Sequence, residues 1–168
     1  MSGIGEMLRI TWAKAGIGLR SAASGEALAG FQGTYGVSLS EQLLDYFRTV
    51  DGMPAGEHDD GLLSFLPLHQ VHPITDRLES LSARFGGITK ALPQPHRCFV
   101  FVEHIRRTHI YAVRLSCDTR VRDPVFWICG SDYHILANSS GEFFRRYLTN
   151  RSSIDMPVTL KTRLLHYR

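Results

Sequence analysis

The chain has 168 residues, of which 43% are hydrophobic and 21% charged, and its formal net charge is +3 at pH 7. Disordered, collagen-like and coiled-coil chains have different compositions, so the sequence indicates one globular domain that needs neither disulfides nor metals for stability. A charge this small gives no argument for nucleic-acid binding by itself.

The first half of the chain is predicted to be mainly helical. Short helices are expected over residues 4–14 and 24–33, although glycines weaken both patterns. The strongest pattern covers Leu39–Val50, where apolar residues recur every three or four positions and form one stripe. Ser38 and Glu41 have capping-box spacing, which predicts that this helix begins next to Ser38.

After this helix, the chain is predicted to continue through a loop into a short strand. Gly52 suits a left-handed helix ending, and the proline, glycines and acids of residues 53–61 indicate an exposed loop. The apolar residues 62–68 indicate a short strand that ends, or lies at a sheet edge, near Pro67. A further helix is expected from Thr75 to Phe85.

The second half is predicted to be rich in strands. The expected strands are Cys98–Val102, His109–Leu115, Val125–Cys129 and Tyr133–Ala137. The first and third are almost entirely apolar, which is typical of strands covered on both faces. The second alternates, which predicts a single core-facing side, and residues 130–132 suit a hairpin turn.

A closing helix is expected after this hairpin. Ser139 and Glu142 repeat the capping-box spacing, and Arg146 follows Glu142 at a distance that favours a helical ion pair. Helices, then a mostly antiparallel sheet, then a closing helix predict a single-domain α+β fold.

Cysteine usage and the N-terminal residues favour the cytoplasm. Cys98, Cys117 and Cys129 form an odd set without the spacing of a zinc or redox pair, so reduced structural thiols are expected. Charged residues interrupt the N-terminal segment, which therefore lacks the apolar core of a signal peptide. No window approaches the roughly 18 apolar residues of a membrane span.

Charge is distributed unevenly along the chain. Residues 41–60 contain six acids against one arginine, a local net charge of −5, and these acids are Glu41, Asp45, Asp51, Glu57, Asp59 and Asp60. Residues 145–168 have a net charge of +5 from Arg145, Arg146, Arg151, Lys161, Arg163 and Arg168 against Asp155. Such segregation can orient a charged partner, although solvated faces without a partner remain the alternative.

Metal and phosphate sites are not indicated by the sequence. His69 and His72 would need a third ligand such as His58 or Asp60, and no recognised metal spacing joins them. Gly16 and Gly18 could begin a phosphate-binding glycine motif, but Ser21 occupies the position of the third glycine and no strand precedes them. No metal and no cofactor are therefore expected.

Catalysis is also not indicated. Glu103, His104 and Asp132 could assemble an acid/base site only if they share a cleft, and no nucleophile signature is present. The basic C-terminal residues lack the interleaved aromatics that stack on bases, so nucleic-acid binding is not expected. We expect a protein without catalytic residues.

Three segments, in this order, resemble the SUKH superfamily, also called Smi/Knr-like. The first is LSEQLLDYFRTVDG, with Ser40 where the family usually has proline and matches at Leu39, Tyr46, Phe47, Asp51 and Gly52. The second is FVFVEHIRRTHIYAV, with Glu103 as the acidic strand end and residues 105–108 where the family often has Gly-Asp. The third matches at Pro124, Val125, Phe126, Trp127, Ala137, Ser139, Ser140, Phe143, Phe144 and Leu148.

The resemblance implies a curled, mostly antiparallel sheet flanked by helices over residues 25–150. Residues 1–24 would then be an N-terminal helical extension and residues 151–168 a basic C-terminal extension. It also implies a non-catalytic protein-binding domain. Many bacterial members are immunity proteins that neutralise a cognate toxin, often a nuclease, by covering its surface.

These observations lead to two functional hypotheses. The first is an immunity protein that uses the acids of residues 41–60 to bind a toxin, for which charge reversal at Asp59 and Asp60 should slow association. The alternative is an intracellular regulatory or scaffold module that binds another cellular protein. No membrane partner is expected for either.

Overall fold

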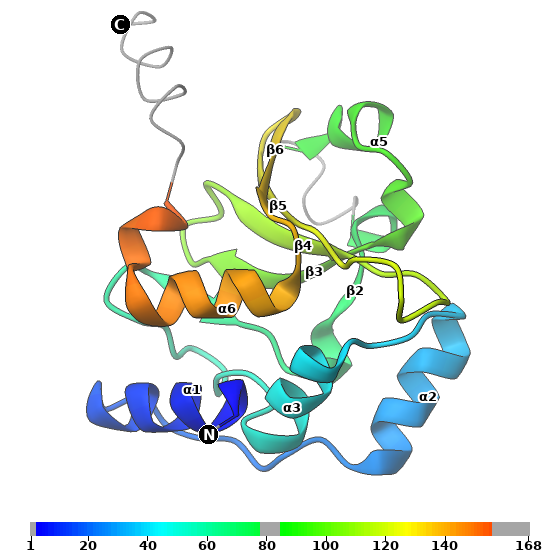
Figure 1. Ribbon diagram of the computed structural model, residues 1–168. Coiled ribbons are helices and arrows are strands. Elements are labelled where there is room, and N and C mark those ends of the chain that lie inside the picture. Colours follow the sequence, from blue (N-terminus) through cyan, green and yellow to red (C-terminus); the bar gives the residue numbers. More distant parts are fainter. Residues whose placement is uncertain (1–2, 78–84, 156–168) are drawn as a thin grey trace, which may run out of the picture.

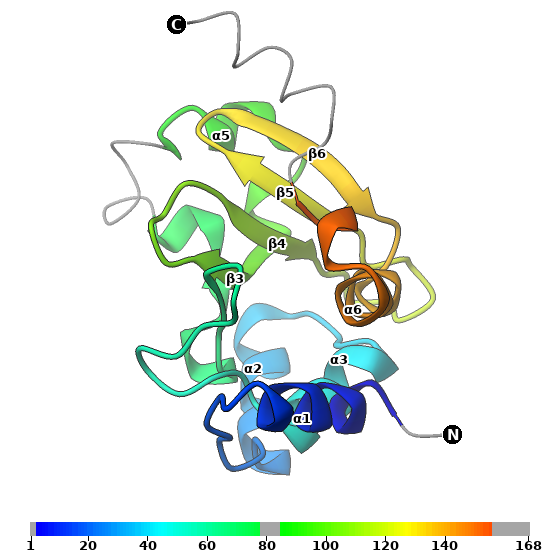
Figure 2. The ribbon, with the colours of Figure 1, turned by 90° about the vertical axis from the view of Figure 1, so that its left-hand side faces the viewer.

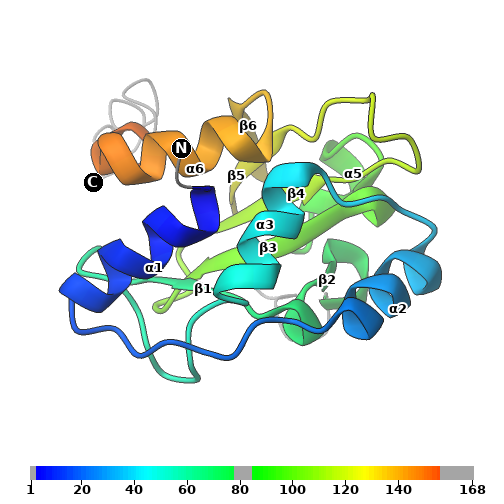
Figure 3. The ribbon, with the colours of Figure 1, turned by 60° about the horizontal axis from the view of Figure 1, so that its bottom comes forward.

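The computed structural model describes residues 3–77 and 85–155 (Figure 1). The helix bounds are Ile4–Lys14 for α1, Gly25–Tyr35 for α2, Glu41–Thr49 for α3, Ile88–Ala91 for α5 and Ser140–Thr149 for α6. Figure 3 shows α1, α2, α3 and α6 on one side of a sheet and α5 on the other. The predicted α+β class is confirmed.

The sheet is open and antiparallel throughout. Its strands are β1 (Leu63–Phe65), β2 (His72–Pro73), β3 (Cys98–His104), β4 (Ile110–Arg114), β5 (Val125–Cys129) and β6 (Asp132–Ala137). Their order is β1-β3-β4-β5-β6, and β2 also pairs with β3. The four strands predicted in the second half are therefore confirmed within two residues at each end.

The middle of the sheet is buried on both faces. β3 and β5 were predicted to be covered on both sides, and their central residues are buried. The prediction of one core-facing side for β4 was wrong, because Ile110 and Ala112 are buried as fully as Tyr111 and Val113. The segment that contains α5 covers the second face and contributes apolar side chains such as Ile88.

Aromatic side chains join the helices to the sheet. α6 lies between the β5–β6 hairpin and the pair formed by α1 and α3 (Figure 2). The Phe143 ring lies 5.2 Å from Phe101 of β3 and 5.4 Å from Tyr111 of β4, and the Phe144 ring lies 5.0 Å from Tyr46 of α3. The apolar stripes predicted for α3 and α6 thus meet in one core.

Both predicted extensions contribute to this core where the structure describes them. Leu8 and Trp12 of α1 are buried, and the Trp12 Nε1–H donates to the Tyr147 hydroxyl at 3.1 Å. At the other end, Ile154 is fully buried and its carbonyl accepts a hydrogen bond of 2.9 Å from the Tyr111 hydroxyl. Residues 3–14 and 151–155 therefore pack with the rest of the chain.

The two predicted capping boxes have different outcomes. Ser38 was expected to cap α3, but the cap is Ser40, whose side chain accepts from the Leu43 N–H. Ser38 is extended instead and bonds to Ser116 across an isolated β-bridge. Ser139 does cap α6, as predicted.

The early elements follow the prediction more loosely. The helices expected over residues 4–14 and 24–33 are α1 and α2, and β1 lies within the strand expected over 62–68. A helix was expected from Thr75 to Phe85, but residues 78–84 lie outside the described residues. The described part before them is a 3-10 turn, η2 (Ile74–Arg77). None of the helices in the described ranges has the length and apolar character that crossing a membrane requires.

Candidate functional site

Two of the six acids predicted to bind a partner are buried. Asp51 and Asp59 are only 7% and 6% exposed, and their carboxylates accept hydrogen bonds from inside the fold. A carboxylate in this position is held by its internal partners, and it does not present its charge to an incoming protein. The predicted acidic face is therefore smaller than the linear cluster suggested.

Asp51 connects the end of α3 to the segment after β1. Its backbone is left-handed, with φ of +43°, and its Oδ1 accepts from the Leu68 N–H at 2.8 Å. Burial raises the pKa of the Asp51 carboxyl above its usual value, while the Leu68 hydrogen bond and the Arg20 and His69 charges oppose this shift. Leu68 begins a 3-10 turn, η1 (Leu68–Gln70), so Asp51 fixes where this turn starts.

Asp59 is the centre of a second internal network. Its Oδ1 accepts from the N–H groups of Gly61 at 3.0 Å and Leu63 at 2.9 Å. Its Oδ2 accepts from the Tyr147 hydroxyl at 3.0 Å and lies 3.2 Å from Nη1 of Arg151. The carboxylate thus joins the loop before β1 to α6 and to the turn that follows α6.

The other four predicted acids have different environments. Asp45 is half-buried and accepts from the Gly5 N–H at the first turn of α1 at 2.9 Å, where the helix dipole favours a negative charge. Asp60 has a side chain that is 97% exposed and is paired with Arg151 at 2.8 Å. Glu41 is exposed on the first turn of α3, and Glu57 is half-exposed in the loop after α3.

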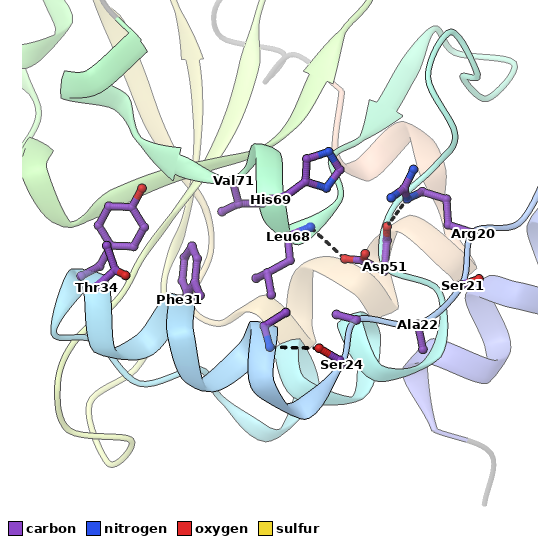
Figure 4. Close-up of a pocket in the computed structure, with 13 residues that line it drawn as sticks. Arg20, Ser21, Ala22, Ser24, Phe31, Thr34, Asp51, Leu68, His69 and Val71 are labelled. Carbon is purple, nitrogen blue, oxygen red and sulfur yellow. Dashed lines mark hydrogen bonds between the residues drawn. The ribbon is translucent and has the colours of Figure 1, made fainter.

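Asp51 also lines a pocket between α2, η1 and the segment Arg20–Ser24 (Figure 4). The cavity volume is about 600 Å³, which is within the range of sites for small ligands or single anchoring side chains. Phe31, Leu68 and Val71 give it an apolar wall. This pocket is the first candidate site for recognition of another molecule.

One end of this pocket is polar. The Arg20 Nε–H donates to the Asp51 carbonyl at 3.2 Å, and His69 lies above the same end in Figure 4. Within the part of the chain that the structure describes, the terminal nitrogens of Arg20 have no hydrogen-bond partner. The pocket can therefore hold an apolar group whose polar tip accepts a hydrogen bond from Arg20.

This pocket was missed by the sequence analysis. Its lining comes from the segment after α1, from α2, from the end of α3 and from η1, which are distant in the sequence. None of these segments carries a recognisable ligand-binding motif. Ser21, Asp51 and His69 were each considered in the sequence for other reasons, and nothing in the sequence placed them together.

The residues considered for catalysis and metal binding are not brought together into a site. Glu103 and His104 are consecutive in β3, so their side chains point to opposite faces of the sheet. Asp132 is exposed at the β5–β6 hairpin. Across residues 3–77 and 85–155, no group of three histidine, cysteine or acidic side chains has an arrangement that could hold a metal ion.

The basic C-terminal residues are partly engaged in internal contacts. Arg146 pairs with Glu142 at 2.5 Å and also donates to the Leu136 carbonyl. Arg151 pairs with Asp59 and Asp60. Lys161, Arg163 and Arg168 lie outside the described residues.

His109 is expected to make stability depend on pH. Its ring lies 4.8 Å from that of His104, and burial, helped by the His104 and Arg151 charges, lowers its pKa to about 4. An unfolded histidine titrates near about pH 6.5, so the unfolded chain binds more protons than the folded chain between these values. Stability is therefore full above about pH 6.5 and falls as the pH decreases toward about 4.

Between about pH 6.5 and about pH 4, the free energy of unfolding should fall by about 2 kcal/mol less in a His109→Gln variant than in the wild type. This figure allows for the partial exposure of His109. Urea unfolding at a series of pH values, followed by tryptophan fluorescence, measures the difference. His96→Gln, at an exposed position in the 3-10 turn η3 (Pro95–Arg97), is the control and should keep the wild-type profile. Superimposable profiles for His109→Gln and the wild type would contradict the prediction.

Comparison of the chain with models of known protein families finds no match, and comparison with curated proteins finds no significant match.

Proposed function

We propose that the chain is a non-catalytic protein-binding domain of the immunity type, which neutralises a cognate toxin in the cytoplasm by covering its surface. The observation that carries this proposal is that the three SUKH-like segments pack against one another. Tyr46 of α3 contacts Phe144 of α6 at 5.0 Å, and Phe101 of β3 contacts Phe143 at 5.2 Å. Residues that resemble the family therefore build the frame, and the exterior remains for recognition.

The pocket in Figure 4 is the anchoring point in this proposal. Interfaces between proteins concentrate their binding energy where one side chain fills a pocket and is fully desolvated. An aromatic or aliphatic side chain of the toxin would pack against Phe31, Leu68 and Val71, and a polar tip would face Arg20. Tight occlusion of the toxin surface around this anchor is the proposed mechanism of inhibition.

The exposed acids supply long-range attraction in the same proposal. Glu41, Glu57 and Asp60 remain at the surface, whereas Asp51 and Asp59 do not. Glu57 lies beside Gly18, two residues before Arg20, so one of these acids is near the pocket. Many toxins of this kind are nucleases with basic active sites, and opposite charge accelerates the encounter of two proteins.

Co-expression tests the function directly. The C-terminal domain of a secreted toxin encoded next to this gene is expressed in a naive bacterial host, with or without the chain. We expect growth only when the chain is present, and a stable complex of the two proteins by size-exclusion chromatography. Continued toxicity in cells that contain the folded chain, with no complex formed, would contradict the proposal.

Charge reversal tests the surface. A double variant Glu57→Lys and Asp60→Lys should slow association with the toxin about ten-fold at low ionic strength, and the difference should shrink as salt increases. Stopped-flow mixing at several salt concentrations measures this. Asp132→Lys with Glu26→Lys, two exposed positions outside the acidic segment, makes the same charge change and should have a smaller effect. Equal slowing by both double variants would show that net charge, not this surface, matters.

A further inference from the structure

A second cavity lies at the Arg114 end of β4, opposite the end that follows His109. It is formed by the segment before β3, the last residue of β4 and the loop between β4 and β5, and its volume is about 520 Å³. The cavity is lined by Arg97, Arg114 and Arg122, together with the apolar residues Pro93 and Val121 and the buried Leu115. We call it the arginine cavity.

The backbone around two of these arginines is held by strand contacts. The Leu115 N–H donates to the Arg97 carbonyl at 2.9 Å, and the Arg114 N–H donates to the Pro124 carbonyl at 3.0 Å. The Arg114 guanidinium also lies over the Phe126 ring, 5.7 Å from its centroid. The cavity is therefore built on the sheet, which gives it a defined shape.

The three guanidinium groups have no carboxylate partner in the described part of the chain. Among residues 3–77 and 85–155, none of the three arginines forms an ion pair. The two nearest acids in the sequence are engaged elsewhere, because Asp118 pairs with Arg120 at 2.8 Å and Asp123 accepts from Ser40 and Ser140. Three arginines thus line one cavity, and within the described ranges none of them is paired with a carboxylate.

We propose that the arginine cavity binds a small organic phosphate. Guanidinium groups match phosphate oxygens with paired hydrogen bonds, and a doubly charged phosphate offsets repulsion among three cations better than a single carboxylate does. The cavity volume suits a small molecule, and the exposed apolar residues Pro93 and Val121 would contact its organic part. Val121 is 52% exposed in the free protein and would become covered by the ligand.

Calorimetric titration with phenyl phosphate and with inorganic phosphate tests the proposal. It also distinguishes a site for an organic phosphate ester from a site for free phosphate. Phenyl phosphate should bind at least several-fold more tightly, because only the ester reaches Pro93 and Val121. Arg122→Gln, at an exposed position where loss of folding is not expected, should weaken binding about ten-fold, and Arg97→Gln and Arg114→Gln should do the same. Circular dichroism confirms that each variant is folded.

Arg120→Gln is the matched control. It removes the same charge from the same loop, but Arg120 is paired with Asp118 and does not line the cavity, so affinity should change less than about two-fold. Alkylation of Cys117, an exposed thiol that lines the cavity, gives a local readout and should be slowed by phenyl phosphate. Cys98 is buried, and burial raises the pKa of its thiol to about 12, so it should react slowly. Peptide mapping identifies whether Cys98, Cys117 or the half-buried Cys129 is alkylated.

Three outcomes would overturn this inference. The first is the absence of saturable binding of phenyl phosphate at millimolar concentrations. The second is an equal loss of affinity in Arg120→Gln and Arg122→Gln, which would indicate general charge attraction. The third is binding of an oligonucleotide with no binding of either phosphate, which would identify the cations as a nucleic-acid surface instead.

Discussion

A Gly52→Ala variant is expected to lose about 3–5 kcal/mol of folding stability, or to remain unfolded, because two independent constraints act on this residue. Its φ is +78°, a left-handed conformation that costs a residue with a side chain about 1 kcal/mol or more. A β carbon would also overlap the backbone nitrogen of Pro67 and lie 2.6 Å from the carbonyl carbon of Leu66. Backbone atoms cannot move aside as a flexible side chain can, so the end of α3 and the chain after β1 would separate.

Gly36→Ala separates the two contributions. Gly36 ends α2 with φ of +61°, but a β carbon there would meet no atom within 4 Å. Its substitution should therefore cost about 1 kcal/mol, the conformational part alone. Urea unfolding monitored by circular dichroism measures both variants. Equal losses at the two positions would show that the contact between Gly52 and residues 66–67 has no energetic role.

The consequences of the Gly52 contact extend to the pocket. Gly52 follows Asp51, whose Oδ1 accepts from the Leu68 N–H, so the same close approach places Asp51 and Leu68 at the pocket wall. This explains why an Asp-Gly pair suits the end of α3. The glycine allows the two segments to touch, and the aspartate then bonds across the contact.

Local patterns predicted most of the secondary structure. Apolar periodicity identified α3 and α6, and continuous apolar runs identified β3 and β5, because burial imposes the spacing of these side chains directly. The cap of α3 was misplaced by two residues, since Ser38 and Ser40 are both suitable caps. The β-bridge from Ser38 to Ser116, a long-range contact, decides between them.

The candidate sites were much harder to predict. Asp59 and Asp60 are adjacent and chemically identical, yet one is 6% exposed and the other has a 97% exposed side chain. Arg151 pairs with both carboxylates, but only Asp59 accepts from the Gly61 and Leu63 N–H groups and from the hydroxyl of Tyr147, which lies far along the chain. Both cavities likewise collect residues from separate segments, so no run of the sequence could have indicated them.

Asp59 and Asp60 should therefore contribute very differently to stability. Asp59→Ala is expected to cost about 3–5 kcal/mol, because the N–H groups of Gly61 and Leu63 and the Tyr147 hydroxyl lose their buried acceptor. Arg151 keeps the exposed Asp60 as its partner. Asp60→Ala removes only an exposed ion pair and should cost about 0.5 kcal/mol or less. Urea unfolding of the two variants under the same conditions measures the contrast.

Asp59→Asn divides the Asp59 contribution further. The amide oxygen can still accept from the Gly61 and Leu63 N–H groups, but it no longer balances the charge of Arg151, so an intermediate loss is expected. If Asp59→Ala were as stable as Asp60→Ala, the internal network would have no energetic weight and Asp59 would be available to a partner. Because we expect the opposite, slower binding of the proposed partner by a variant that changes Asp59 would report partial unfolding. The acidic surface is tested by changes at the exposed acids Glu41, Glu57 and Asp60.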